Sequence, residues 1–139
     1  MTPDQVDGWL AAYARAWREK DDIGIVQLFT EDALYRSSPT APAHRGRDGI
    51  AAYWRRATQT QSDLDLRFGQ PIQDGHRVAV EWWAVMKDPD WRPEAGSPWV
   101  TLPGCLLLRF SDLLLCQELR EYYNPLFGEA APAPEGWGE

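Results

Sequence analysis

The sequence predicts an α+β domain, a cone in which three N-terminal helices pack on a curved antiparallel sheet. Apolar residues recur at helical spacing as far as about residue 60, and beyond it they alternate in steps of two. Helices grouped before strands favour a sheet that carries its helices on one face. A bent sheet closed by helices leaves a conical cavity, which is a common site for a small ligand.

The first helix begins at a capping sequence. Thr2 is the expected N-cap, Pro3 lies in the first turn and Gln5 completes a capping box. The large apolar residues that follow recur every three or four positions and should form one buried stripe: Val6, Leu10, Tyr13 and Trp17.

A short second helix and a first strand should follow. Asp21 and Asp22 end the first helix and can cap a helix over 23–29. We expect a turn at 30–32, with Asp32 as a turn and capping residue, and a short strand over 33–37.

A loop rich in Pro and Ser, residues 37–46, leads to the third helix. Asp48 is the expected cap of this helix, which covers 49–58. The residues expected to face inward are Ile50, either Tyr53 or Trp54, and Ala57.

Four antiparallel strands account for most of the remaining chain. Asp74-Gly75 is a strong hairpin sequence between the first two, and residues 87–98, rich in Pro, form a loop before the third. The strands are expected at 63–68, 76–86, 99–110 and 113–124. We assign residues 1–125 to one domain and 126–139 to a Pro/Gly-rich tail that is extended or partly disordered.

The charge balance argues against two classes of partner. The chain has 14 basic and 21 acidic residues and a net charge of −7. An acidic chain lacks the attraction that dominates nucleic-acid binding, and anionic membranes repel it. The apolar run at 102–110 is too short to span a membrane, and the N-terminus has no signal-peptide pattern. We therefore expect a cytoplasmic protein that binds neither nucleic acid nor membrane.

No cofactor or metal site is expected. Cys105 and Cys116 stand alone, without the Cys/His spacing of a zinc site, and each should be a small buried hydrophobe. The sequence also holds no nucleotide or flavin motif.

Five segments carry a resemblance in their order and spacing: residues 16–29, TEDALY at 30–35, HRGRDGIAAYW at 44–54 after the Pro39 loop, the Asp74-Gly75 hairpin, and residues 109–124. Over residues 5–125 the chain resembles the SnoaL-like branch of the nuclear transport factor 2-like superfamily. The resemblance implies the cone-shaped fold. Its members include ketosteroid isomerase, limonene epoxide hydrolase, polyketide cyclases, dehydratases and plain binding subunits, so the fold does not fix the function.

The resemblance does not carry over the catalytic residues of ketosteroid isomerases. Those enzymes place a general-base Asp where this chain has Ser38, and their two oxyanion-hole residues fall near Ala14 and Leu106. Steroid isomerase chemistry is therefore not expected.

The resemblance to epoxide hydrolases retains one catalytic acid. Their final strand carries an acid between Arg and Tyr, and Glu121 occupies that position in this chain. Their Arg and second Asp fall near Trp82 and Ala84, so the ion network that activates water there is missing. Alternation along the last strand puts Glu121 on the apolar face with Leu119 and Tyr123, which should point to the cavity. Burial against aromatic walls raises the pKa of a carboxylate and suits it to general acid–base catalysis. The alternative is an exposed Glu121, or one paired with an Arg.

The remaining candidates are side chains expected to line the pocket around Glu121: Trp17, Tyr35, Ser37, Trp54, Trp82 and Tyr123. Tyr35 and Ser37 would offer two hydroxyls from one strand. His44 lies in a loop at the expected cavity mouth, where it is either a titratable site residue or solvated.

Trp82 and Trp83 must point to opposite faces, and alternation alone does not say which one faces the cavity. We place Trp82 in the pocket. Trp83 would then form an outer apolar patch that predicts a homodimer through the sheet. Trp91 and Trp99 flank the 87–98 loop and could close over a ligand or a neighbouring subunit.

Two functions fit these observations. The first is a SnoaL-like protein without assigned activity, whose conical aromatic pocket binds a small apolar metabolite. The second is a cofactor-free isomerase, cyclase, dehydratase or hydrolase with Glu121 as general acid/base. A catalytic pocket should place at least two polar groups around Glu121, whereas a binding pocket should be apolar or filled by its own side chains.

Overall fold

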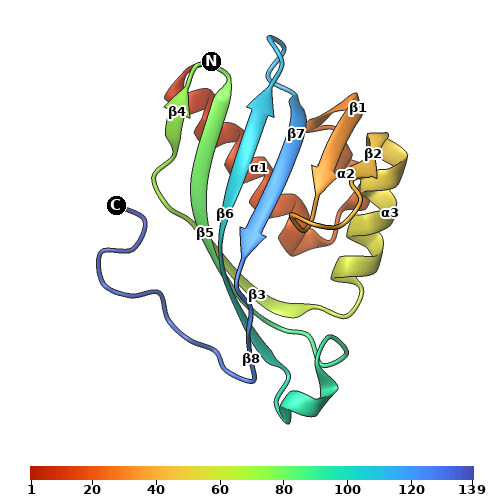
Figure 1. Cartoon of the computed structure of the whole chain (residues 1–139), viewed down its shortest axis with the longest axis vertical. Helices are drawn as coiled ribbons and strands as arrows, with labels where there is room; N and C mark the ends of the chain where they lie inside the picture. The colour runs from red at the N-terminus through yellow and green to blue at the C-terminus, as the bar shows by residue number, and fades with distance from the viewer.

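The computed structural model describes the whole chain, residues 1–139. Its helices are α1 (Pro3–Glu19), α2 (Asp22–Val26), α3 (Gly46–Thr58) and a short 3-10 helix, η1 (Pro93–Ala95). Its strands are β1 (Phe29–Arg36), β2 (His44–Arg45), β3 (Ser62–Phe68), β4 (Ile72–Asp74), β5 (Arg77–Lys87), β6 (Trp99–Phe110), β7 (Cys116–Tyr123) and β8 (Leu126–Phe127). Figure 1 shows α1 crossing one face of the sheet and α3 lying beside β1 and β2. The predicted α+β fold with three N-terminal helices is confirmed, and none of its helices is long and apolar enough to cross a membrane.

The sheet is mixed, where we expected it to be antiparallel throughout. Its strands run in the order β2-β1-β7-β6-β5-β3, with β4 paired to β5 and β8 to β6. β1 lies parallel to β7, with Tyr35 opposite Leu119, whereas all other pairs are antiparallel. The parallel pair joins the first strand to the last long one, so its direction depends on how the whole chain wraps and not on a local turn.

The start of α1 follows the capping prediction. The Thr2 hydroxyl accepts a hydrogen bond from the Gln5 N–H (3.2 Å), and the Gln5 side chain accepts one from the Thr2 N–H (2.8 Å). The helix ends where Lys20 takes a left-handed conformation with φ 54°. All four residues of the predicted stripe are buried: Val6, Leu10, Tyr13 and Trp17.

The boundaries after α1 differ from the prediction. Asp21 does cap α2, since its carboxylate accepts a hydrogen bond from the Gly24 N–H (2.8 Å), but the helix stops before Phe29. The expected turn at 30–32, with Asp32, is part of β1. Long-range pairing is the reason, because Phe29 lies opposite Cys116 of β7 and a bulge absorbs the residues that follow.

Two other local expectations are wrong. Arg45 is the N-cap of α3 and makes no side-chain capping bond, whereas Asp48 lies in the first turn, where its charge still interacts favourably with the helix dipole. β7 begins at Cys116 and not at residue 113, because Leu114 takes a φ of 64° and turns the chain.

The C-terminal tail, residues 126–139, lies along the sheet. The Trp83 indole N–H donates to the Ala131 carbonyl (3.0 Å), and the Trp83 ring meets the ring of Trp137 edge-on. The Thr101 hydroxyl donates to the Glu129 carbonyl (2.7 Å). The tail therefore covers part of the outer face through which we predict a homodimer, and dimerisation through that face stays a prediction.

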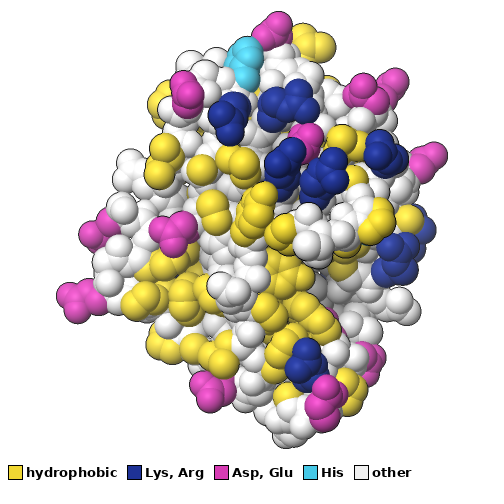
Figure 2. Space-filling view, viewed as in Figure 1, with side chains coloured by type: hydrophobic (Ala, Val, Ile, Leu, Met, Phe, Trp, Pro, Cys, Tyr) yellow, Lys and Arg dark blue, Asp and Glu magenta, His cyan; other side chains and the backbone are white.

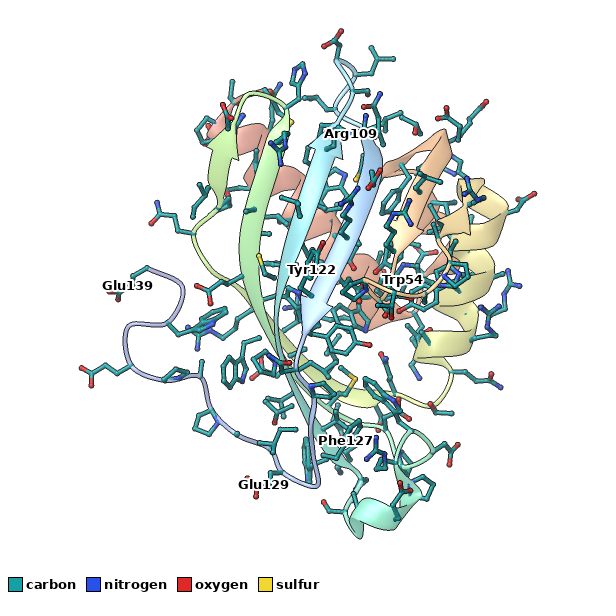
Figure 3. All side chains as sticks on the ribbon, viewed as in Figure 1. Trp54, Arg109, Tyr122, Phe127, Glu129 and Glu139 are labelled. Atoms are coloured by element: carbon teal, nitrogen blue, oxygen red, sulfur yellow. The ribbon has the colours of Figure 1, made fainter.

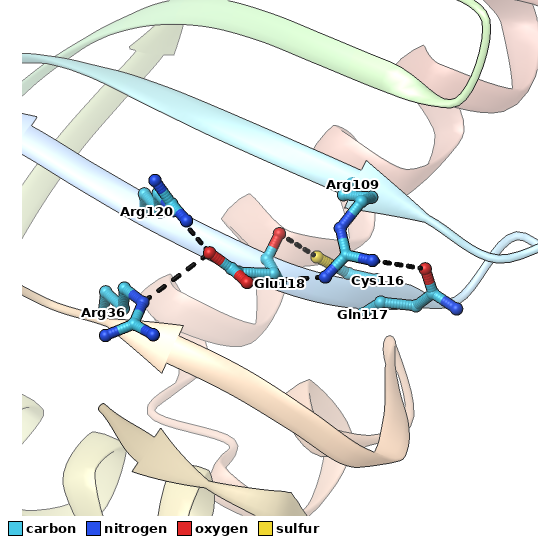
Figure 4. Close-up of polar contacts among 6 residues, drawn as sticks. All are labelled: Arg36, Arg109, Cys116, Gln117, Glu118 and Arg120. Atoms are coloured by element: carbon cyan, nitrogen blue, oxygen red, sulfur yellow. Dashed lines mark hydrogen bonds and ion pairs between the residues drawn. The ribbon is translucent and has the colours of Figure 1, made fainter. Parts of the chain in front are cut away.

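Basic side chains gather on the upper part of the sheet face that Figure 2 shows. Glu118 of β7 lies among three of them (Figure 4). Its carboxylate accepts a hydrogen bond from Arg120 and lies 3.6 Å from Arg36 and 3.4 Å from Arg109. This acid is therefore paired with cations, as surface carboxylates commonly are.

Candidate functional site

A cavity of about 360 Å³ lies between the helices and the sheet. Six aromatic side chains form its walls: Trp17, Tyr53, Trp54, Trp82, Trp91 and Tyr123. Its polar lining consists of Ser37, Ser38, Arg56, Thr60, Gln61, Asp88, Asp90 and Glu121. Of the seven residues predicted for the site, all but Tyr35 line this cavity.

Glu121 points into the molecule, as the alternation along β7 predicts. Glu121 is 8% exposed and Leu119 is fully buried. Tyr122, the residue after Glu121, is exposed on the other face of the sheet (Figure 3). Glu121 takes part in no ion pair. The alternative of an exposed or Arg-paired Glu121 is therefore wrong for this structure.

Two buried tyrosines form a row of hydrogen bonds that ends at the Glu121 carboxylate. The Tyr35 hydroxyl donates a hydrogen bond to Glu121 Oε1, and the Tyr13 and Tyr35 hydroxyl oxygens are 2.9 Å apart. Because the Tyr35 hydroxyl uses its hydrogen in the bond to Glu121, the Tyr13 hydroxyl must be the donor in the bond between the two tyrosines. Tyr35 thus lies beneath the acid and does not face the ligand space, which corrects our expectation for it.

Burial sets the protonation of this site. Desolvation raises the pKa of Glu121 to about 7, although the hydrogen bond from Tyr35 works in the opposite direction. Burial and then the nearby Glu121 charge raise the pKa values of Tyr13 and Tyr35, so both stay neutral hydrogen-bond donors. At neutral pH Glu121 can therefore both accept and release a proton.

The two acids of β7, Glu118 and Glu121, have opposite pKa shifts because they lie on opposite faces of the sheet. Partial burial raises the pKa of Glu118, but the hydrogen bond and charge of Arg120, together with the other two arginines, outweigh it and leave the pKa below its ordinary value. Glu121, three residues further along, has no cation beside it, and its pKa is raised. Glu118 therefore stays ionised at neutral pH, where Glu121 titrates.

Trp82 faces the cavity and Trp83 the outer face, which the sequence left open. The Trp82 ring lies against Gly104 of β6, where an added Cβ would come within 2.5 Å of it. Any larger residue at position 104 would push the indole out of place. Gly104 therefore fixes the position of one cavity wall.

A second acid, Asp88, was not predicted from the sequence and is 6% exposed. The Thr60 hydroxyl donates to its carboxylate (2.6 Å), and its backbone N–H donates to the Pro98 carbonyl (2.8 Å). The stretch Lys87-Asp88-Pro89-Asp90 has the composition of a solvated loop, so no sequence signal marks this burial. The contact with Pro98 closes the loop over Asp88.

His44 belongs to β2 and not to a loop, and it stands behind the cavity wall. Its ring stacks on Tyr53 at 4.3 Å, and its Nε2 lies 3.1 Å from the Ser37 hydroxyl. Burial, and then the charge of Arg56, lower the pKa of His44. It does not line the cavity.

Of the two tryptophans that flank the 87–98 loop, Trp91 lines the cavity and Trp99 does not. The Lys87 ammonium lies over the Trp99 ring at 5.1 Å. Cys105 and Cys116 are both unpaired thiols, and no group of three or more His, Cys, Asp or Glu side chains is placed to hold a metal ion.

Comparison with known proteins identifies a family and many structural neighbours, two of which are compared with this chain. Residues 10–118 match the family described as SnoaL-like domain. One neighbour is the epoxide hydrolase/cyclase-like enzyme SalBIII, described for its role in pyran ring formation in the polyether salinomycin. It has a TM-score of 0.69 and 22% identity, over 85% of this chain and 89% of that chain.

A second neighbour is a hypothetical protein with a ketosteroid isomerase-like fold from Catenulispora acidiphila, in complex with trimethylamine. It has a TM-score of 0.71 and 21% identity, over 88% of this chain and 87% of that chain. Among curated proteins no sequence matches. At these identities the two neighbours show the fold alone.

Proposed function

The chain belongs to the SnoaL-like domain family, and we propose that it binds a small, largely apolar molecule in its cavity and transfers protons on it. Glu121 is the general acid/base of this reaction, which needs no cofactor. The reaction class is an isomerisation, cyclisation, dehydration or hydrolysis.

One observation carries the proposal. Glu121 is buried at an open aromatic cavity, it has no cationic partner, and desolvation raises its pKa to about 7. A group whose pKa lies near the working pH is the most effective proton carrier, because both of its forms are populated. Perturbed pKa values cluster at functional sites, so a carboxylate whose pKa is raised by desolvation in a cleft is a candidate catalytic group.

The polar groups of the cavity favour catalysis over passive binding. A binding pocket should be apolar or filled by its own side chains, but this one is open and holds a second buried carboxylate, Asp88, with the hydroxyls of Thr60 and Ser37. Tyr35 lies outside the cavity and donates the hydrogen bond that stabilises the ionised form of Glu121. These groups could orient an oxygen or nitrogen of the ligand.

The descriptions of the structural neighbours are consistent with this proposal. SalBIII, which shares the fold, is described for a role in pyran ring formation, and cyclisation is one of the proposed reaction classes. The Catenulispora acidiphila protein is described with a small organic amine, which supports a small organic ligand here too.

The test uses nitrobenzisoxazole, a generic probe of carboxylate bases. A base removes the ring C–H proton while the N–O bond breaks, and the product is a coloured cyanophenolate. We expect the rate of turnover to rise with pH with a midpoint at about 7, as Glu121 ionises. Glu121→Gln should lower the rate by about 100-fold or more.

Glu118→Gln is the matched control, because it makes the same change on the outer face of the same strand and should leave the rate unchanged. Equal rates for Glu121→Gln and the wild type would contradict the proposal.

A further inference from the structure

The charges that line the cavity are unequal in number. Three carboxylates face it, Glu121, Asp88 and Asp90, against one basic group, Arg56. Arg56 forms an ion pair with none of them. With Glu121 ionised, the space therefore carries an excess of negative charge.

Asp88 is a buried carboxylate without a cation. No Arg, Lys or His lies within ion-pair distance, and the Thr60 hydroxyl is the only side chain bonded to its carboxylate. Removing a carboxylate from water without a counter-charge is costly. A purely apolar ligand would leave this carboxylate without a counter-charge, whereas a cationic ligand would supply one.

The aromatic walls of the cavity that Asp88 lines suit an organic cation better than a metal ion. The ring of Trp17 lies 5.4 Å from that of Trp54 and 5.8 Å from that of Trp82, and Gln61 holds the Trp17 indole N–H at 2.7 Å. The faces of indole rings attract ammonium groups, and methylated ammonium ions most of all because they are weakly hydrated. Metal ions such as Ca²⁺ or Mg²⁺ require a shell of oxygen ligands instead.

We propose that the cavity takes an organic ammonium ion, a tertiary or quaternary amine on a small, largely apolar body. The ammonium group lies against Asp88 and the indole rings, and the body extends to Glu121. This inference rests on the proposed function, since it names the class of molecule on which Glu121 acts.

Glu121 gives the binding a pH dependence. The ionisable groups around it on the cavity side are Tyr13 from α1, Tyr35 from β1, Tyr53 and Arg56 from α3, Tyr123 from β7, Asp88 and Asp90 after β5, and His44 behind Tyr53. On the outer side, Arg36 and Arg120 line a small pocket with Glu121, and both are paired with Glu118. Burial raises the pKa values of the four tyrosines and lowers that of His44, so these stay uncharged near pH 7. Glu121 is then the group that gains charge as the pH rises through about 7, and ammonium binding should strengthen with it.

The test compares choline with dimethylbutanol, its uncharged isostere, in which a tert-butyl group replaces the trimethylammonium group. Binding is followed by tryptophan fluorescence and calorimetry. Above about pH 7.5 we expect choline to bind at least about tenfold more tightly than dimethylbutanol. The affinity for choline should fall on acidification, and that for dimethylbutanol should not.

Asp88→Asn tests the position of the ammonium group and should bring the two affinities close together. Thr60 can still donate to the new amide oxygen, and circular dichroism checks that the variant folds. Asp65→Asn, the same change on an exposed residue of β3, should preserve the preference for choline. Equal or weaker binding of choline by the wild type overturns the inference without any variant. That result leaves the proposed function intact if nitrobenzisoxazole turnover still depends on Glu121, so the two failures are distinguishable.

Discussion

The substitution Glu121→Gln should stabilise the protein above about pH 7 and change its stability little near pH 4.5. The pKa of Glu121 is about 7 in the folded state, against an ordinary value of 4.5. The folded state holds the proton more tightly than the unfolded chain, so stability is lost as the pH rises from the lower value to the higher. Gln cannot ionise, and it keeps both the shape of the side chain and an oxygen that accepts from Tyr35.

The magnitude follows from the size of the pKa difference. Each unit corresponds to about 1.4 kcal/mol, so a rise from 4.5 to about 7 costs the wild type about 3 kcal/mol once both states are ionised. Urea denaturation of both proteins at several pH values between about 4.5 and 8 measures this cost. The free energy of unfolding of the variant, relative to the wild type, should increase by about 3 kcal/mol across this range.

The matched control is Glu118→Gln, which should behave in the opposite way. The pKa of Glu118 is lowered, so its ionisation favours the folded state above the ordinary pKa and that contribution disappears on acidification. The Glu118 variant should therefore be less stable than the wild type at neutral pH and approach it in acid. If the Glu121 variant and the wild type change in parallel over the whole pH range, the argument that burial raises the pKa of Glu121 is refuted.

Three further substitutions test the surroundings of the acid and the outer face. Tyr35→Phe removes the donor to Glu121 and should move the midpoint of the pH–rate profile with nitrobenzisoxazole upward by about one unit; an unchanged midpoint would show that this hydrogen bond does not tune the acid. Gly104→Ala places a Cβ within 2.5 Å of the Trp82 ring and should destabilise the protein by about 1–3 kcal/mol in urea denaturation, so wild-type stability would contradict the close contact. Trp83→Glu should convert the predicted homodimer to a folded monomer in light scattering, and a monomeric wild type at high micromolar concentration would exclude the dimer.

Local patterns in the sequence were enough to predict the elements and the orientation of Glu121. The Thr2 capping box forms as expected, because a cap depends on residues three positions apart. Asp74-Gly75 makes a hairpin turn as expected, with Gly75 at φ 58°, although the turn joins β5 to the short strand β4 and not directly to β3. Alternation along β7 was sufficient to bury Glu121, because neighbouring residues of a strand must point to opposite faces. That prediction needed no knowledge of what lies across the cavity.

Contacts between distant residues were decided only by the tertiary structure. Tyr35 and Glu121 are 86 positions apart and Tyr13 and Tyr35 are 22 apart, so no local pattern joins them into one hydrogen-bonded chain. The parallel pairing of β1 with β7, which brings Tyr35 beside Glu121, likewise depends on how the whole chain wraps. The burial of Asp88 is of the same kind. Its neighbours in the sequence are polar or Pro, and only the folded loop and Thr60 remove its carboxylate from water.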